Sequence, residues 1–142
     1  MKKTILIILL CGFIIFSLCS CSQDKKESTY NITTIQNVST NIYDISLTGA
    51  TIVIKDTNEN PYTYGEWYKI EKEENGKWYD VETIIKNYGF NDIGYLVDEF
   101  NEVTFVMDWS WLYGELSKGS YRIIKQVNNQ YIAIPFNIAT TS

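Results

Sequence analysis

The amino-acid sequence predicts an all-β protein, an antiparallel β-sandwich of about seven strands. Short runs of alternating apolar and polar residues follow one another between residues 41 and 138, and turn-forming residues separate them. Six or seven such runs in about 100 residues are typical of a sandwich. Only residues 79–88 have apolar side chains at helical spacing, and that segment is short enough to be a loop with one or two turns at most.

The predicted strands share β-branched or aromatic side chains and a turn signal at one end. They cover residues 51–55, 62–72, 77–81, 102–108, 121–127 and 131–138. Asn75-Gly76, which joins the second strand to the third, is the strongest two-residue hairpin signal. The strand at 102–108 shows a clear period of two that places Val103, Phe105 and Met107 on one face, as expected for a half-buried strand. Pro135 places the last strand at a sheet edge or a bulge.

Composition excludes several functional classes. Lys and Arg total 12 and Asp and Glu total 17, which gives the 142 residues a formal net charge of -5. An acidic chain is poorly suited to nucleic acid, because phosphate binding requires positive charge. The chain contains no His, which excludes sites that need an imidazole base or an imidazole zinc ligand. We therefore expect no metal site and no cofactor.

The N-terminus has the parts of an export signal. Lys2 and Lys3 precede an apolar run at residues 5–18, which is too short for a membrane span because a spanning helix needs about 20 residues. Leu18-Cys19-Ser20-Cys21 follows and resembles the bacterial lipobox. The resemblance implies that residues 1–20 are a lipoprotein signal peptide and that Cys21 is lipidated. The alternatives are a secreted protein cleaved nearby or an uncleaved anchor.

A chain processed in this way depends on Cys21 alone for membrane attachment. All three Cys residues lie in the export segment or at its end, so the sandwich has none and can form no disulfide. Without Lys2 and Lys3, the chain has 10 basic and 17 acidic residues, a formal charge of -7. Anionic lipid headgroups do not attract a domain of this charge. The predicted location is the extracytoplasmic side of the cell membrane, with the protein anchored by lipid.

The remaining sequence divides into three parts. Residues 21–40 are polar, rich in Ser, Thr and Asn, and have no sustained period, so we expect the lipidated Cys followed by a flexible tether. The sandwich is expected to span residues 41–138, and residues 139–142 to form a short tail.

Several segments with aromatic residues and glycine occur in a fixed order. They are Tyr64-Gly65-Glu66-Trp67-Tyr68, Asn75-Gly76-Lys77-Trp78-Tyr79, Asp92-Ile93-Gly94-Tyr95 and Asp108-Trp109-Ser110-Trp111-Leu112-Tyr113-Gly114. Together they resemble a bacterial immunoglobulin-like domain family, the type found in small lipoproteins and at the exported end of beta-lactam-sensor-type membrane metallopeptidases. The resemblance covers about residues 41–138 and implies an Ig-like sandwich without catalytic residues. No peptidase motif accompanies it, so the enzyme chemistry does not carry over.

Leu116, Gly119 and Tyr121 have the spacing of a tyrosine corner, in which a Tyr at the start of a late strand bonds to the backbone a few residues upstream. Gly119 would let the chain turn, and Leu116 would fill the core below. The alternative is an ordinary turn followed by a strand. Antibody-type domains pack a Trp on a disulfide in their core. Because no disulfide is available here, we expect Trp67 or Trp78 to fill that space.

Trp109, Trp111 and Tyr113 are the candidate binding residues. They are two positions apart, so an extended chain would place their rings in a row on one face. Such a row can stack on sugar rings or contact a protein partner. The alternative is that the three rings pack in the core and shape the turn before the next strand. Exposure discriminates the two, because a binding face requires a contiguous exposed patch.

The sequence thus predicts a membrane-anchored surface lipoprotein with a non-catalytic Ig-like domain that binds a protein or glycan partner or assists one. The alternative is a carbohydrate-binding module for cell-wall or host glycans that uses the aromatic face. A third reading, a small His-free enzyme, has no recognisable pair of nucleophile and base to support it.

Overall fold

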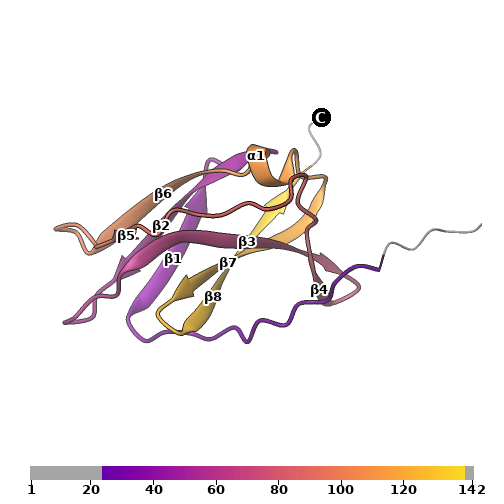
Figure 1. Cartoon of the computed structure of the whole chain (residues 1–142). Helices are drawn as coiled ribbons and strands as arrows, with labels where there is room; N and C mark the ends of the chain where they lie inside the picture. Colours follow the sequence, from indigo (N-terminus) through magenta and orange to yellow (C-terminus); the bar gives the residue numbers. More distant parts are fainter. Residues whose placement is uncertain (1–23, 140–142) are drawn as a thin grey trace, which may run out of the picture.

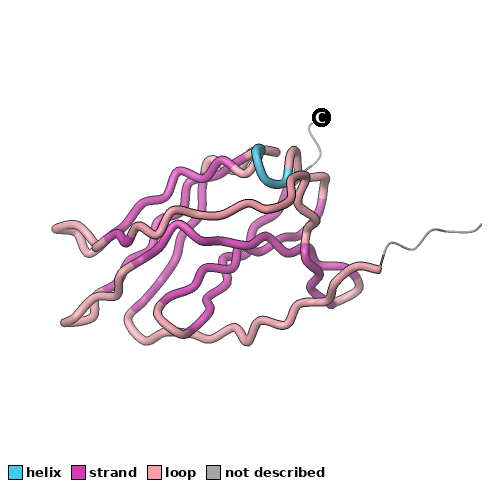
Figure 2. The backbone as a smooth tube through the Cα atoms, viewed as in Figure 1, coloured by secondary structure: helices cyan, strands magenta, loops and turns pink. Residues whose placement is uncertain are grey.

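The computed structural model describes residues 24–139, and these residues form two antiparallel sheets packed face to face (Figure 1). The strands are β1 (Val38–Tyr43), β2 (Gly49–Asp56), β3 (Tyr64–Glu74), β4 (Lys77–Asp80), β5 (Gly94–Tyr95), β6 (Glu102–Asp108), β7 (Gly119–Val127) and β8 (Gln130–Ile138). A helical turn, α1 (Ser110–Tyr113), joins β6 to β7. Irregular chain connects β4 to β5 and runs along the side of the sandwich (Figure 2).

The order of the strands identifies the type of sandwich. The smaller sheet has the order β1-β2-β6, and the larger has the order β4-β3-β7-β8, with β5 pairing a further part of β3. In chain order these are the A, B and E strands against the C′, C, F and G strands of an immunoglobulin-like domain. The prediction of an all-β, Ig-like antiparallel sandwich without a disulfide is therefore confirmed.

Alternating side chains from both sheets fill the space between them. In β6, Val103 and Met107 are buried while Val106 between them is 83% exposed, because successive side chains point to opposite faces of a strand. The same alternation in the other strands brings aliphatic side chains together in the core. The strand side chains with no exposed surface include Ile52, Ile54, Ile70, Ile123 and Val127, and Leu112 of α1 joins them in the core.

The tryptophan of the core is Trp109, which corrects the expectation for Trp67 or Trp78. Trp109 has no exposed surface, and its indole N–H donates a hydrogen bond to the Leu47 carbonyl at 2.8 Å. Tyr68 takes the inward position on β3, so the neighbouring Trp67 lies on the outer face of the larger sheet. Trp78 is also outside the core, in a partly exposed position on β4.

Residues 24–37 do not form the predicted flexible tether but cross the outer face of the larger sheet (Figure 1). We call this segment the N-terminal strap. The Ser28 N–H donates to the Trp78 carbonyl on β4 at 2.8 Å, and the Thr33 N–H donates to the Tyr131 carbonyl on β8 at 2.8 Å. Because β4 and β8 stand at opposite ends of the strand order, the strap spans the larger sheet from edge to edge.

Aromatic contacts hold the strap in place. The Tyr30 ring contacts those of Trp67 and Tyr131, with centroid distances of 6.0 and 4.9 Å. Ile35, at 6% exposure, then enters the core, and β1 begins at Val38. The predicted domain start at residue 41 is thus too late, because these few apolar side chains are anchored by distant strands and leave no period of their own.

Lys125 is buried inside the sandwich, where it compensates for a break in strand pairing. The register between β3 and β7 shifts between Tyr64 and Tyr68, at a bulge or irregularity. Lys125 Nζ donates to the carbonyls of Gly65 and Trp67 in this stretch, at 2.8 and 3.2 Å. Burial disfavours the charged ammonium and lowers the pKa of Lys125 to about 8.

Candidate functional site

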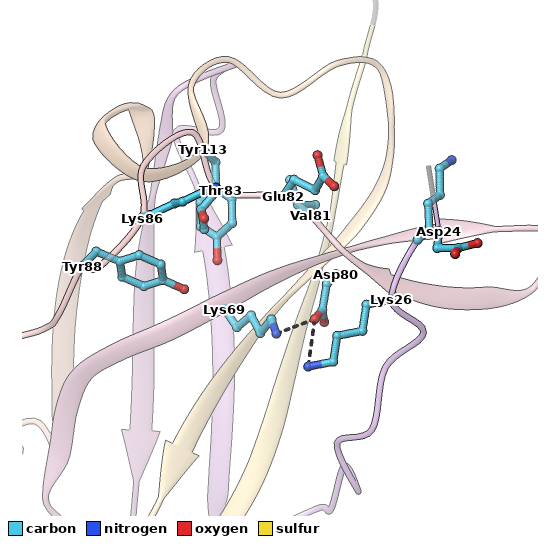
Figure 3. A pocket seen from close by; sticks show the side chains of 11 residues that line it. Asp24, Lys26, Lys69, Asp80, Val81, Glu82, Thr83, Lys86, Tyr88 and Tyr113 are labelled. Atoms are coloured by element: carbon cyan, nitrogen blue, oxygen red, sulfur yellow. Dashed lines mark hydrogen bonds and ion pairs between the residues drawn. The ribbon is translucent and has the colours of Figure 1, made fainter. Parts of the chain in front are cut away.

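A cleft of about 550 Å³ opens where the strap, β3, β4, α1 and the loop after β4 meet (Figure 3). Its polar lining comes from five separate segments. The side chains include Lys26 of the strap, Lys69 of β3, Asp80 of β4, Thr83, Lys86 and Tyr88 of the loop, and Tyr113 of α1. The strands fix Lys69 and Asp80, while the loop and the strap form the rim. The strap contributes Asp24, Lys25 and Lys26 to the lining, so its packing against the sheet helps to shape the cleft.

An ion pair forms the floor of the cleft. Lys69 Nζ lies 2.6 Å from Asp80 Oδ2, and Lys26 Nζ lies 3.7 Å from the same oxygen. Burial by itself would lower the pKa of Lys69, but the hydrogen bond and charge of Asp80 outweigh it, so the pKa is raised and the side chain is cationic at neutral pH. The side chains of Lys69 and Asp80 remain 19% and 14% exposed, so a ligand in the cleft can reach them.

Two phenol hydroxyls point into the space above this ion pair, those of Tyr88 and Tyr113 (Figure 3). The Tyr113 hydroxyl accepts a hydrogen bond from the Ile70 N–H at 3.2 Å. Burial raises the pKa of Tyr113, so its hydroxyl stays protonated and its own proton can still be donated. The cleft therefore presents hydrogen-bond donors and acceptors side by side.

The predicted row of Trp109, Trp111 and Tyr113 does not form. These residues lie on and next to α1, where positions two apart point to nearly opposite sides of a helix. Trp109 and Tyr113 are in the core, at 0% and 5% exposure, and Trp111 reaches the surface at 42%. Asp108 favours the helical turn over a strand, because its carboxylate accepts hydrogen bonds from the N–H and the hydroxyl of Ser110.

Trp111 has aromatic partners that the sequence analysis missed. Tyr88 and Phe90, from the loop after β4, contact it edge to face with centroid distances of 6.3 and 5.9 Å. Tyr88 also lines the cleft, so these three residues form an aromatic cluster at its rim. No local sequence pattern predicts this cluster, because Tyr88 and Trp111 are distant in sequence and meet only when α1 packs against the loop.

The connection that carries α1 is fastened at the start of β7. The Tyr121 hydroxyl donates to the Ser117 carbonyl at 2.7 Å. Leu116 is buried in the core, and Gly119 opens the strand. A Tyr at the start of the F strand that bonds to the backbone a few residues upstream has the geometry of a tyrosine corner.

Several predicted features lie outside the described residues. Cys21, the signal peptide at 1–20 and the last residues of the 139–142 tail lie there. Between residues 24 and 139, no cluster of three or more potential metal-ligating side chains is present. The same range contains no helix of the length and hydropathy that a membrane span requires.

Comparisons with known proteins bear on the domain as a whole. Neither the curated proteins nor the solved structures give a match. A family model described as a bacterial Ig-like domain matches residues 26–137, which take in most of the strap and nearly all of the two sheets. The strand order of an immunoglobulin-like sandwich and a match over most of the sequence agree: the chain belongs to the bacterial Ig-like domain family.

Proposed function

We propose that the protein is a surface lipoprotein, anchored by lipid at Cys21 on the extracytoplasmic side of the cell membrane, whose Ig-like domain is a non-catalytic binding or accessory module. Membership of the bacterial Ig-like family supports an accessory role. The fold alone does not name the ligand, because Ig-like sandwiches host many functions. The lipobox-like Leu18-Cys19-Ser20-Cys21, directly after the apolar run, is the observation that carries the proposal.

The docked strap gives this anchor a geometric consequence. Lys25, at the start of the strap, lies four residues after Cys21. It forms an ion pair with Glu74 at the end of β3. Four extended residues reach at most about 14 Å. A lipid on Cys21 would therefore hold the β3–β4 end of the sandwich, and the cleft lined in part by the strap, close to the bilayer.

Replacing the anchoring residue tests the proposal. Cys21→Ala removes the only thiol at the predicted cleavage site, so we expect loss of the lipid by mass spectrometry and release of the protein from the membrane fraction. Cys19→Ala is the matched control and is expected to stay lipidated and membrane-bound. Membrane retention of the Cys21→Ala protein would overturn the lipid anchor.

A second candidate function is carbohydrate binding. The aromatic face on which that alternative rested does not exist as a row, since Trp109 and Tyr113 are buried. Exposed aromatic rings are nevertheless present, because Trp111 and Tyr88 are each 42% exposed and Tyr88 borders the cleft. This juxtaposition of rings and polar groups favours a glycan over a purely apolar ligand.

A further inference from the structure

We propose that the cleft binds a pyranose unit of an uncharged glycan, with Tyr88 as the stacking ring and the Lys69–Asp80 pair as the recognition element for two adjacent hydroxyl groups. This inference rests on the proposed function as a binding module and names the ligand class of that module. Three observations carry it: the balance of charge in the cleft, the arrangement of its hydrogen-bonding groups and the support of the Tyr88 ring.

The charge of the cleft is nearly balanced. Lys25, another lining residue, is already paired with Glu74 outside the cleft. The other charged side chains of the lining are Lys26, Lys69 and Lys86 against Asp24, Asp80 and Glu82. The whole chain is acidic, which repels anionic polymers at longer range. These charges favour an uncharged ligand over a phosphate or a carboxylate.

The ion pair is arranged to recognise a diol. Within residues 24–139, both ion-pair contacts of Asp80 go to Oδ2, which leaves Oδ1 to accept a hydrogen bond from a ligand hydroxyl. Lys69 uses one N–H toward Asp80 and can donate another to a neighbouring hydroxyl oxygen. Adjacent ring hydroxyls of a sugar present this pairing of donor and acceptor. Tyr113 adds a protonated hydroxyl above the pair.

The Tyr88 ring is held at the rim in a fixed orientation. Phe90 and Trp111 both contact it edge to face, with centroid distances of 6.1 and 6.3 Å. A ring held in this way loses little conformational freedom when the apolar C–H face of a sugar packs on it. The cleft volume of about 550 Å³ lies within the range of small-ligand pockets.

Titration calorimetry on the full chain in detergent micelles tests the proposal, with maltotetraose, cellotetraose and chitotetraose as probes. We expect a Kd of about 0.1–1 mM for at least one of them, as for a single shallow site. Tyr88→Ala and Asp80→Asn are each expected to weaken that binding at least about tenfold, the equivalent of about 1.4 kcal/mol. Tyr88→Phe, which keeps the ring, is expected to retain most of the affinity.

Two control variants match the changes in the cleft. Tyr43→Ala removes a ring of 43% exposure from the smaller sheet, and Glu102→Gln removes the partner of Lys55 in another strand-to-strand ion pair. Neither is expected to change sugar binding.

Absence of binding by all three probes at about 10 mM overturns the proposal. So does unchanged binding in Tyr88→Ala and Asp80→Asn, or tighter binding of inorganic phosphate in the cleft. A chain that is lipidated but binds no sugar refutes this inference alone and leaves the anchor standing.

Discussion

At the scale of single residues, the buried charges make the sharpest predictions. Lys125 has a pKa of about 8 in the folded protein, against 10.5 for an ordinary lysine. Between these two values the unfolded chain holds a proton that the folded protein lacks, so the free energy of unfolding should rise with pH. The slope for one group is at most about 1.4 kcal/mol per pH unit.

Buried tyrosines limit this rise at higher pH. Burial raises the pKa of Tyr64, Tyr68 and Tyr113 above the ordinary 10.0, so these residues keep their protons in the folded protein where the unfolded chain has lost them. Their contribution to stability is present below pH 10 and is lost above it. Urea unfolding midpoints should therefore rise from pH 8 and reach a maximum near about pH 9.5–10. An equally steep rise in Lys125→Met would contradict this assignment.

Glu71 provides a second prediction at this scale. Its carboxylate has no exposed surface and is paired with Arg122, whose Nε lies 2.7 Å from Glu71 Oε2. Arg122→Met leaves the carboxylate buried and unpaired, so we expect the free energy of unfolding to fall by about 3–5 kcal/mol. The double variant with Glu71→Leu removes the orphaned charge and should recover much of the loss. If urea unfolding shows no recovery, the pair is not the source of the cost.

At the scale of elements, the sequence was informative where the partners of a residue are near it in the chain. The hairpin at Asn75-Gly76 is present as the turn between β3 and β4, and Tyr121 bonds to Ser117 only four residues upstream. Period-two alternation likewise located β6. In each case a local pattern specifies a local structure.

The elements that were predicted wrongly depend on distant contacts or on a local competitor. The strap has no period of its own and is ordered by strands much later in the chain. The segment around Trp111 alternates like a strand, but hydrogen bonds from Ser110 to Asp108 start a helical turn instead. The cleft could not be predicted either, because Lys69, Asp80 and Tyr88 meet only through the packing of three different segments.

At the scale of the whole molecule, the strap connects the predicted anchor, the larger sheet and the cleft. It spans the sheet from β4 to β8, packs Tyr30 against Trp67 on the outer face and supplies Lys26 to the cleft wall. A free tether at residues 24–37 would remove one wall of the cleft and would leave the orientation of the domain relative to Cys21 undefined. The docked strap thus limits the distance from Cys21 to the sandwich and helps to shape the cleft.

Hydrogen exchange on the lipid-anchored protein shows directly whether the strap is docked. The amides of Ser28 and Thr33 donate to carbonyls of β4 and β8, so we expect them to exchange as slowly as amides within the neighbouring strands. Tyr30→Ala, which removes the ring packed on Trp67 and Tyr131, should speed both while leaving the core of β7 protected. Exchange of Ser28 and Thr33 at the rate of an unprotected chain in the unaltered protein would show that the strap is not docked and that residues 24–37 are a flexible tether.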